Sequence, residues 1–280
     1  MLPGALLAPR VQQIGRDRQG LPVGAAQLSL PRPTDPPPAR APAPDDTAAL
    51  ADLLTEARRP VILAGRGGRE AGAELRALAE ASGALLATSA VANGLFHDDP
   101  FCLGISGGFS SPLAAELITE AGLIVAFGCA LNMWTMRHGA LIGSDATLVQ
   151  VDTNPAALGR LRPVARGIVG DSAATAAAVT ALLRQRPDAT DGYRSAERAE
   201  QIRTGIRWND VNTDDLSTGE RIDPRVLSAR LDQVLPRERV VAVDSGNFMG
   251  YPSQYLGVPD EFGFSVIATR LRIPRCSALT

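Results

Sequence analysis

The stretch PVILAGRGGREAGAELRALAEAS, residues 60–82, joins an apolar run to a glycine-rich turn and then to a helical pattern. The run at 60–65 is apolar without interruption, which is typical of a strand buried on both faces of a parallel sheet. After the turn, Leu75, Leu78 and Ala79 recur at helical spacing and would share one face. A buried strand, a glycine turn and an amphipathic helix together predict one unit of an α/β layer structure.

The same alternation of apolar runs and helical patterns continues through the middle of the chain. Ser111 and Asp171 each precede a helical pattern, and each carries a side-chain oxygen that can accept a backbone N–H bond and cap the helix. The alternation predicts an α/β fold with a Rossmann-like, doubly wound parallel sheet in residues 47–186. The further apolar runs lie at 84–89, 123–128, 147–152 and 167–170, and the helical patterns at 45–58, 111–122 and 171–186.

Composition divides the rest of the chain into three further regions. Residues 1–46 include the stretch PRPTDPPPARAPAP, with seven prolines in fourteen positions, so we expect a proline-rich, disordered arm. Residues 187–222 are polar and are interpreted as a connector that carries one helix. In residues 223–280, Asp223 caps a helical pattern and the apolar strand 240–243 follows, which predicts the truncated start of a second α/β domain.

Composition also limits the classes of function. All 28 basic residues are arginine, the net charge is −2 and no basic stripe occurs, so we expect no nucleic acid partner. The most apolar window is about 14 residues long and falls short of the roughly 18–20 needed to cross a bilayer, so we expect no membrane span. The three cysteines are widely spaced and match no disulfide framework, which favours a reducing cytoplasm.

Glycine-rich and small-residue turns supply the first candidate binding residues. Gly65 and Gly67 match two positions of the G-x-G-x-x-G fingerprint, but the third position is Glu70. These two glycines therefore serve either tight turns and close packing or contact with a nucleotide. Gly107 and Asn132 lie in two further turns, and a set of such turns would form a crevice at the carboxyl edge of the sheet.

Histidines and cysteines give little sign of catalysis. His97 and His138 are the only histidines, and neither has metal-ligand spacing to another His or Cys, so both are interpreted as structural or solvated. Cys102 and Cys129 are interpreted as small apolar residues rather than nucleophiles. From the residues alone we therefore predict no catalytic side chain and no metal ligand.

Several strings nevertheless occur in the order and at the spacing of a known family. They are RPVILAGRGG, GALLATSAVANGLFHDDP, GISGG, LNMWT, VQVDTNPAALG and GIVGDSAATA. Residues 47–186 resemble the central domain of thiamine-diphosphate enzymes of the acetolactate synthase, benzoylformate decarboxylase and oxalyl-CoA decarboxylase type, and residues 222–264 are similar to the start of that family's diphosphate-binding domain. The resemblance implies thiamine diphosphate with Mg²⁺ as cofactor, a 2-keto acid as substrate, and a homodimer or a complementing subunit as partner.

The resemblance also implies where the cofactor would lie. The family's diphosphate loop falls on the turn after the strand 240–243, which makes Ser245, Gly246, Asn247 and Phe248 the expected contacts. Gly246 would expose backbone donors, the Asn247 amide would donate to anion oxygens, and Phe248 would form an apolar wall. A plain strand-to-helix turn is the alternative.

Two parts of the family's pattern have no counterpart in the sequence. The glutamate that activates the thiamine ring belongs before residue 47, and the GDG…N metal loop belongs well beyond residue 264. We therefore expect a fragment or subunit of a 2-keto-acid carboligase or decarboxylase that is inactive alone, its two ends reflecting truncation or a shifted reading frame. The alternatives are a non-catalytic module that binds FAD or ADP in the central domain, and a gene relic.

Overall fold

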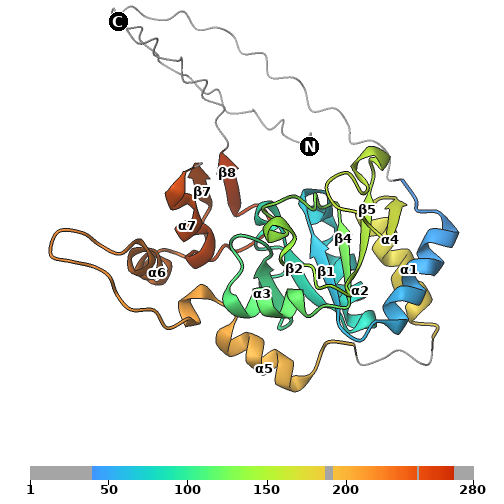
Figure 1. Ribbon diagram of the computed structural model, residues 1–280, viewed down its shortest axis with the longest axis horizontal. Helices are drawn as coiled ribbons and strands as arrows, with labels where there is room; N and C mark the ends of the chain where they lie inside the picture. Colours follow the sequence, from blue (N-terminus) through green and yellow to red (C-terminus); the bar gives the residue numbers. More distant parts are fainter. Residues whose placement is uncertain (1–39, 187–191, 245, 268–280) are drawn as a thin grey trace, which may run out of the picture. The chain divides into compact units, whose positions relative to one another are not determined.

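A computed structural model describes residues 40–186, 192–244 and 246–267 of the chain, and every structural statement below concerns those residues. The cofactor-contact prediction for Ser245, most of the predicted proline-rich arm and Cys276 lie outside them. Figure 1 shows the arrangement of the helices and strands.

Within the described residues, the main sheet has six parallel strands in the order β3-β2-β1-β4-β5-β6. The order reverses between β1 and β4, which is the topological switch point of a doubly wound sheet. The predicted Rossmann-like α/β fold is therefore confirmed. The strands are β1 Pro60–Ala64, β2 Leu85–Thr88, β3 Cys102–Ile105, β4 Leu123–Phe127, β5 Thr147–Asp152 and β6 Arg166–Val169.

Helices cover both faces of this sheet because successive residues of each strand point to opposite sides (Figure 1). Ile62 and Ala64 face a core formed with α1 Pro44–Glu56, α2 Gly72–Ser82 and α4 Ser172–Leu183. Val61 and Leu63 face a second core, formed with α3 Pro112–Thr119 and α5 Ala196–Gly205. Every residue of β1 is buried, which explains its uninterrupted apolar sequence.

The predicted caps form as expected. Ser111 accepts a bond from Ala114 N–H at the start of α3, and Asp171 accepts one from Ala174 N–H at the start of α4. Helix α2 ends at Gly83, whose φ of +63° is the left-handed conformation that glycine adopts readily. Short polar side chains and one glycine therefore fix where these helices begin and end.

Two boundaries differ from the sequence-based expectation. The sequence predicts no strand between 89 and 123, but the structure has the edge strand β3 at Cys102–Ile105. This strand is short, holds Gly104 at a φ of +71° and pairs with β2 through a register shift, so its sequence lacks a clean apolar run. Helix α1 begins at Pro44, inside the region expected to be a disordered arm.

A smaller α/β segment follows the main sheet. It contains α6 Pro224–Val234, β7 Val241–Asp244, α7 Gly250–Tyr255 and β8 Phe264–Ile267, and β7 pairs with β8 in parallel. Its small core of Val241, Val243, Val258 and Phe264 packs against Ala90 of the larger unit. Short 3-10 helices occupy the connections: η1 Arg66–Ala71, η2 Ala90–Ala92, η3 Arg137–Gly139, η4 Pro155–Ala157, η5 Trp208–Asp210 and η6 Asn247–Met249.

The predicted connector is partly packed onto the main sheet. Ile202 of α5 belongs to the second core, and the Tyr193 hydroxyl donates to the Leu117 carbonyl at 3.2 Å. Residues 192–206 therefore form part of the covering of the sheet. In the described part of the chain, no helix is long and apolar enough to cross a membrane.

Candidate functional site

The turns after β1 and β4 meet at the switch point of the sheet. Gly65 N–H donates to the Phe127 carbonyl and Gly67 N–H donates to the Gly128 carbonyl, each at 2.9 Å. A Cβ on Gly65 would lie 2.4 Å from the Cα of Cys129, so only glycine allows this approach. Both predicted glycines are brought to the expected edge, where their N–H groups serve turn packing.

The two other predicted turn residues lie in a second pair of interlocked loops. Gly107 has a φ of +106°, and a Cβ there would lie 1.8 Å from the Trp134 carbonyl oxygen. The Asn132 side-chain oxygen accepts bonds from Trp134 N–H and Thr135 N–H, both at 2.9 Å. Gly107 and Asn132 therefore hold the shape of neighbouring loops, because their polar atoms and close approaches are used within the fold.

Backbone strain is concentrated in the same loop. Arg137 and His138 have φ values of +46° and +56°, which non-glycine residues seldom adopt. The exposed side chains of Met133 and Trp134 precede them. Strain of this kind often marks a functional loop, and this one lies next to the carboxyl end of β4.

A cavity of about 520 Å³ lies between η1 and the start of α4. Arg66, Gly67 and Arg69 line one side, and Ser172 of α4 lines the other. Ser172 is 4 % exposed and its hydroxyl has no hydrogen-bond partner among the described residues. The carboxylates of Glu70 and Asp171 line the same cavity, and Asp171 already caps the N-terminus of α4 by accepting from Ala174 N–H. An anion there would therefore meet two carboxylates as well as the two arginines.

The turn after β7 holds the remaining predicted residues. Gly246 precedes η6 with a φ of +151°, and a Cβ there would lie 3.2 Å from the Phe248 ring. Phe248 is 63 % exposed, so its ring is available to a ligand. The position of the Asn247 side chain is not described. The turn can therefore offer backbone N–H groups and one apolar ring to an anion.

The cysteine side chains are not activated. Burial raises the pKa of the Cys129 thiol to about 12 and that of the Cys102 thiol to about 11. Both thiols are protonated at neutral pH, so neither is a ready nucleophile. Among the described residues, no group of three or more His, Cys, Asp or Glu side chains could hold a metal ion.

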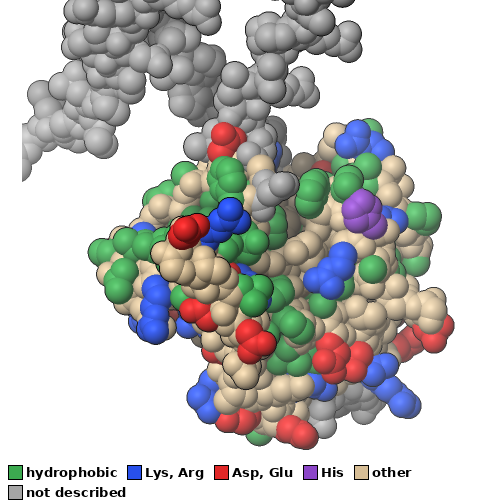
Figure 2. Space-filling view, turned by 60° about the vertical axis from the view of Figure 1, so that its left-hand side comes forward, with side chains coloured by type: hydrophobic (Ala, Val, Ile, Leu, Met, Phe, Trp, Pro, Cys, Tyr) green, Lys and Arg blue, Asp and Glu red, His purple; other side chains and the backbone are tan. Residues whose placement is uncertain are grey.

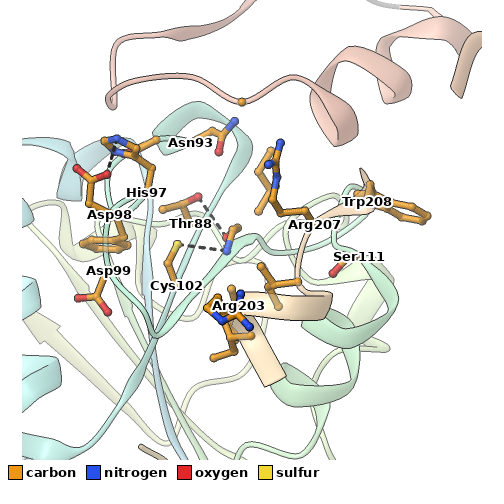
Figure 3. A pocket seen from close by; sticks show the side chains of 18 of the residues that line it. Thr88, Asn93, His97, Asp98, Asp99, Cys102, Ser111, Arg203, Arg207 and Trp208 are labelled. Atoms are coloured by element: carbon orange, nitrogen blue, oxygen red, sulfur yellow. Dashed lines mark hydrogen bonds and ion pairs between the residues drawn. The ribbon is translucent and has the colours of Figure 1, made fainter. Parts of the chain in front are cut away.

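A further cavity was not predicted from the sequence. A cavity of about 700 Å³ lies between the ends of β2 and β3, helix α5 and the segment that follows α7. In Figure 3, Ser111 and Trp208 lie on one side of it and the His97–Asp98 pair on the other. We call it the α5–α7 cavity, and its lining includes Thr88, Cys102, Ile202, Trp208, Tyr255 and Val258.

The lining of the α5–α7 cavity comes from three separate segments, 88–111, 196–208 and 253–258, so no local motif reveals it. The only sequence signal is aromatic, because Trp208 and Tyr255 follow polar stretches that otherwise read as connections. Trp208 Nε1 donates to the Phe109 carbonyl at 2.8 Å, and its ring centroid lies 6.1 Å from that of Tyr255.

Comparison with known proteins agrees with the fold. Residues 47–179 match the family model described as thiamine pyrophosphate enzyme, central domain. The chain is 34 % identical over 222 residues to a sulfoacetaldehyde acetyltransferase of Roseovarius nubinhibens, covering 70 % of this chain and 36 % of that protein. It is 27 % identical over 263 residues to a chloroplastic acetolactate synthase of Oryza sativa subsp. japonica, covering 90 % of this chain and 39 % of that protein.

A third relative is a probable 2-ketoarginine decarboxylase of Pseudomonas aeruginosa, 33 % identical over 164 residues that cover 57 % of this chain and 28 % of the relative. The chain therefore spans about two fifths or less of the length of each of these three proteins. The residues that match the family model contain all six strands of the main sheet. Through residues 47–179, which form its central domain, the chain belongs to the thiamine pyrophosphate enzyme family.

Proposed function

We propose that the chain is a fragment or subunit of a thiamine-diphosphate-dependent carboligase or decarboxylase that acts on 2-keto acids and resembles acetolactate synthase. The observation that carries the proposal is the family match over residues 47–179. The β7 turn that follows supports it, because Gly246 takes a backbone conformation suited to close approach of an anion. We place this function in the cytoplasm, on the evidence of the cysteine pattern.

The described residues fit part of the expected cofactor. The turn at Gly246 would hold a phosphate group through backbone N–H groups, with Phe248 beside it. The described residues offer no metal-ligand group, so they do not fit the Mg²⁺ that accompanies the diphosphate. When bound, thiamine diphosphate supplies an electron sink for the carbanion left by decarboxylation. We assign no chemical step to this chain alone.

Calorimetric titration of the chain with thiamine diphosphate and Mg²⁺ tests the cofactor assignment. Gly246→Ala should weaken binding at least about tenfold, because an L side chain is strained at this φ. Gly219→Ala is the matched control, since a Cβ there meets no atom within 4 Å. Equal affinities in the wild type and both variants would remove the β7 turn from the cofactor site.

Inactivity of the isolated chain has its own test. With thiamine diphosphate, Mg²⁺ and either pyruvate or benzoylformate, the chain should release no CO₂ and form no carboligation product. Turnover above the level of free cofactor would show that residues 1–280 suffice and would overturn this part of the proposal.

A second candidate function is non-catalytic binding of FAD or ADP by the central domain. The cavity between η1 and α4 supports it, because Arg66, Arg69 and Ser172 line one space, beside the carboxylates of Glu70 and Asp171. ADP should then raise the melting temperature by mass action, and Ser172→Val should reduce the rise. An unchanged melting temperature with saturating ADP or FAD would rule this candidate out.

The proposed partner is a second copy of the chain or a complementing subunit. Helix α6 supports this, because Leu227, Leu231 and Val234 lie at i, i+4 and i+7 and remain 40 %, 36 % and 75 % exposed. Figure 2, in which the left-hand side of Figure 1 is turned forward, shows apolar side chains interspersed with charged ones on that face. A stripe of this kind is typical of an interaction surface.

A further inference from the structure

The α5–α7 cavity differs in chemistry from the sites considered above. Its volume of about 700 Å³ lies within the range of small-molecule pockets. It lies beside β2 and β3 and is lined by Phe109 of the turn that holds Gly107, whereas the turns of Gly65 and Gly67 lie at β1 and β4. Nothing in the proposed cofactor or nucleotide binding uses it.

Aromatic side chains are concentrated in its lining. The whole chain has seven Phe, three Tyr and two Trp, and four of these line this one cavity: Phe96, Phe109, Trp208 and Tyr255. The Trp208 ring is held by its bond to the Phe109 carbonyl and by contact with Tyr255. A fixed aromatic wall favours flat or branched apolar groups.

The charged side chains that line the cavity are already paired. His97 Nε2 lies 2.9 Å from Asp98 Oδ1, Arg203 Nη2 lies 2.6 Å from Glu200 Oε1, and Arg207 Nη2 lies 2.6 Å from Asp232 Oδ2. Asp99, the remaining charged lining residue, faces Arg76 and Arg194 at 3.5 and 3.8 Å. An ionic ligand such as a 2-keto acid would therefore compete with a partner of its own charge at each of these groups.

Uncharged polar groups in the lining are less well satisfied. Thr88 is 2 % exposed, and its hydroxyl donates only a long bond of 3.4 Å to the Gly104 carbonyl. The Asn93 and Gln254 amides line the cavity and make no side-chain hydrogen bond within the described residues. These groups can give and accept hydrogen bonds without requiring charge on the ligand.

We propose that the α5–α7 cavity binds a neutral, largely apolar small molecule with an aromatic or branched aliphatic body and one or two hydrogen-bonding groups. We infer a neutral ligand because the charged side chains of the lining are already paired. The aromatic side chains of the lining favour an apolar body. Thr88, Asn93 and Gln254 would supply the polar contacts of the ligand. This site is separate from the proposed cofactor and nucleotide sites and does not depend on them.

The test uses the full chain with Trp134→Phe, which leaves Trp208 as the single tryptophan. The probe is N-phenyl-1-naphthylamine, a neutral aromatic amine that becomes fluorescent in apolar sites. We expect saturable binding of one probe per chain, with quenching of Trp208. Binding without any change in Trp208 emission would place the probe elsewhere and overturn the proposal.

Filling the cavity provides the matched comparison. Ala199 lines it from α5, so Ala199→Phe should weaken probe binding at least tenfold, whereas Thr204→Phe on the exposed face of the same helix should leave it unchanged. Circular dichroism checks the fold of each variant. If Ala199→Phe fails to fold, Ala196→Phe in the exposed first turn of α5 replaces it.

Two further outcomes would contradict the proposal. The probe could bind the exposed α6 stripe, in which case Leu231→Asp would abolish binding and Ala199→Phe would not. The cavity could instead receive side chains of another polypeptide, in which case Ala199→Phe would change the oligomeric state measured by sedimentation. Loss of binding in Ala199→Phe alone, with an unchanged oligomeric state, is the supporting result.

Discussion

The N–H of Gly67 donates to the carbonyl of Gly128 at 2.9 Å, and this bond joins the turns after β1 and β4 where the strand order of the sheet reverses. Gly128 has a φ of +52°, and a Cβ there would lie 2.4 Å from the Cα of Gly67. Two backbones thus approach at a distance that no larger residue permits. The two turns are therefore in direct contact at the switch point of the sheet.

Gly128→Ala should therefore destabilise the fold strongly. The left-handed φ costs about 1 kcal/mol or more for alanine, and the backbone overlap adds to it, so we expect a loss of roughly 2–4 kcal/mol. Urea denaturation followed by circular dichroism measures the change. Gly122→Ala, at the other end of β4, meets no atom within 4 Å and should change stability by less than about 0.5 kcal/mol. Similar losses in both variants would contradict this account.

The main sheet was predictable because burial on both faces demands uninterrupted apolar strands, as in 123–127, and because helix caps have a short-range chemistry, as at Ser111. Strand β3 was missed because an edge strand with Gly104 at positive φ carries neither signal. The sequence leaves open whether Gly65 serves packing or contact with a ligand. The packing role of Gly65 follows from the close approach of residue 129 to Gly65, and this approach depends on tertiary structure.

Arg69 should hold the small α/β segment against the main sheet. Its guanidinium donates to the Glu261 carbonyl at 2.6 Å and lies 4.5 Å from the centroid of the Phe262 ring. Together such contacts are worth about 1–2 kcal/mol. Arg69→Ala should therefore speed hydrogen exchange in residues 258–264 roughly 5- to 30-fold, as measured by mass spectrometry.

Arg66→Ala is the control for this experiment, because Arg66 is exposed on the same 3-10 helix and makes no hydrogen bond or ion pair with its side chain among the described residues. It should leave exchange in 258–264 at the wild-type rate. Equal acceleration in both variants would mean that η1 acts through its fold rather than through the Arg69 contacts.

The buried thiols should resist modification. Because burial raises the pKa of Cys129 to about 12, its thiolate is scarce at pH 8, and reaction with Ellman's reagent should be at least about a hundredfold slower than in the unfolded chain. Cys276→Ser removes the cysteine outside the described residues. Because the pKa of Cys129 is higher in the folded than in the unfolded chain, the protonated thiol contributes to folding stability. This contribution is complete below the ordinary thiol pKa and is lost as the pH rises toward the pKa of the folded state. Rapid labelling of Cys129 in the folded Cys276→Ser variant would contradict its burial.

Asp223 should make the start of α6 sensitive to acid. Hydrogen bonds from the Arg225 side chain hold the pKa of its carboxyl well below the usual range, and its carboxylate also accepts from Arg225 N–H at 2.8 Å. The carboxylate therefore contributes stability above the ordinary aspartate pKa, and this is lost as pH falls below about 4. Exchange of the α6 amides should accelerate over that range in the wild type. In Asp223→Asn, which keeps the cap oxygen but lacks the charge, the dependence should be shallower, and an equal slope would contradict this role.

The candidate binding sites were less predictable than the fold, for a physical reason. The burial of a strand can be predicted from the strand's own apolar residues. The α5–α7 cavity, in contrast, exists because the fold brings together Thr88, Trp208 and Tyr255 from distant segments. The cavity between η1 and α4 could be partly anticipated, because Gly67 and the cap at Asp171 both mark strand ends. The position of the Ser172 hydroxyl in this cavity could not be anticipated, since its surroundings depend on how α4 packs.

The exposed stripe of α6 should drive association. Val234 is 75 % exposed, and Leu227 and Leu231 extend the same face. Covering these side chains with another protein surface would remove them from water, which is favourable. Sedimentation velocity should show a concentration-dependent oligomer for the wild type. Leu231→Asp should shift it to monomer, because a carboxylate in an apolar interface is costly to bury. Gln233→Asp, on the same helix but outside the stripe, adds the same charge and should leave association unchanged. A wild-type chain that stays monomeric at high concentration would leave only a complementing subunit as the proposed partner. Loss of association in both variants would show that net charge, rather than the stripe, controls association.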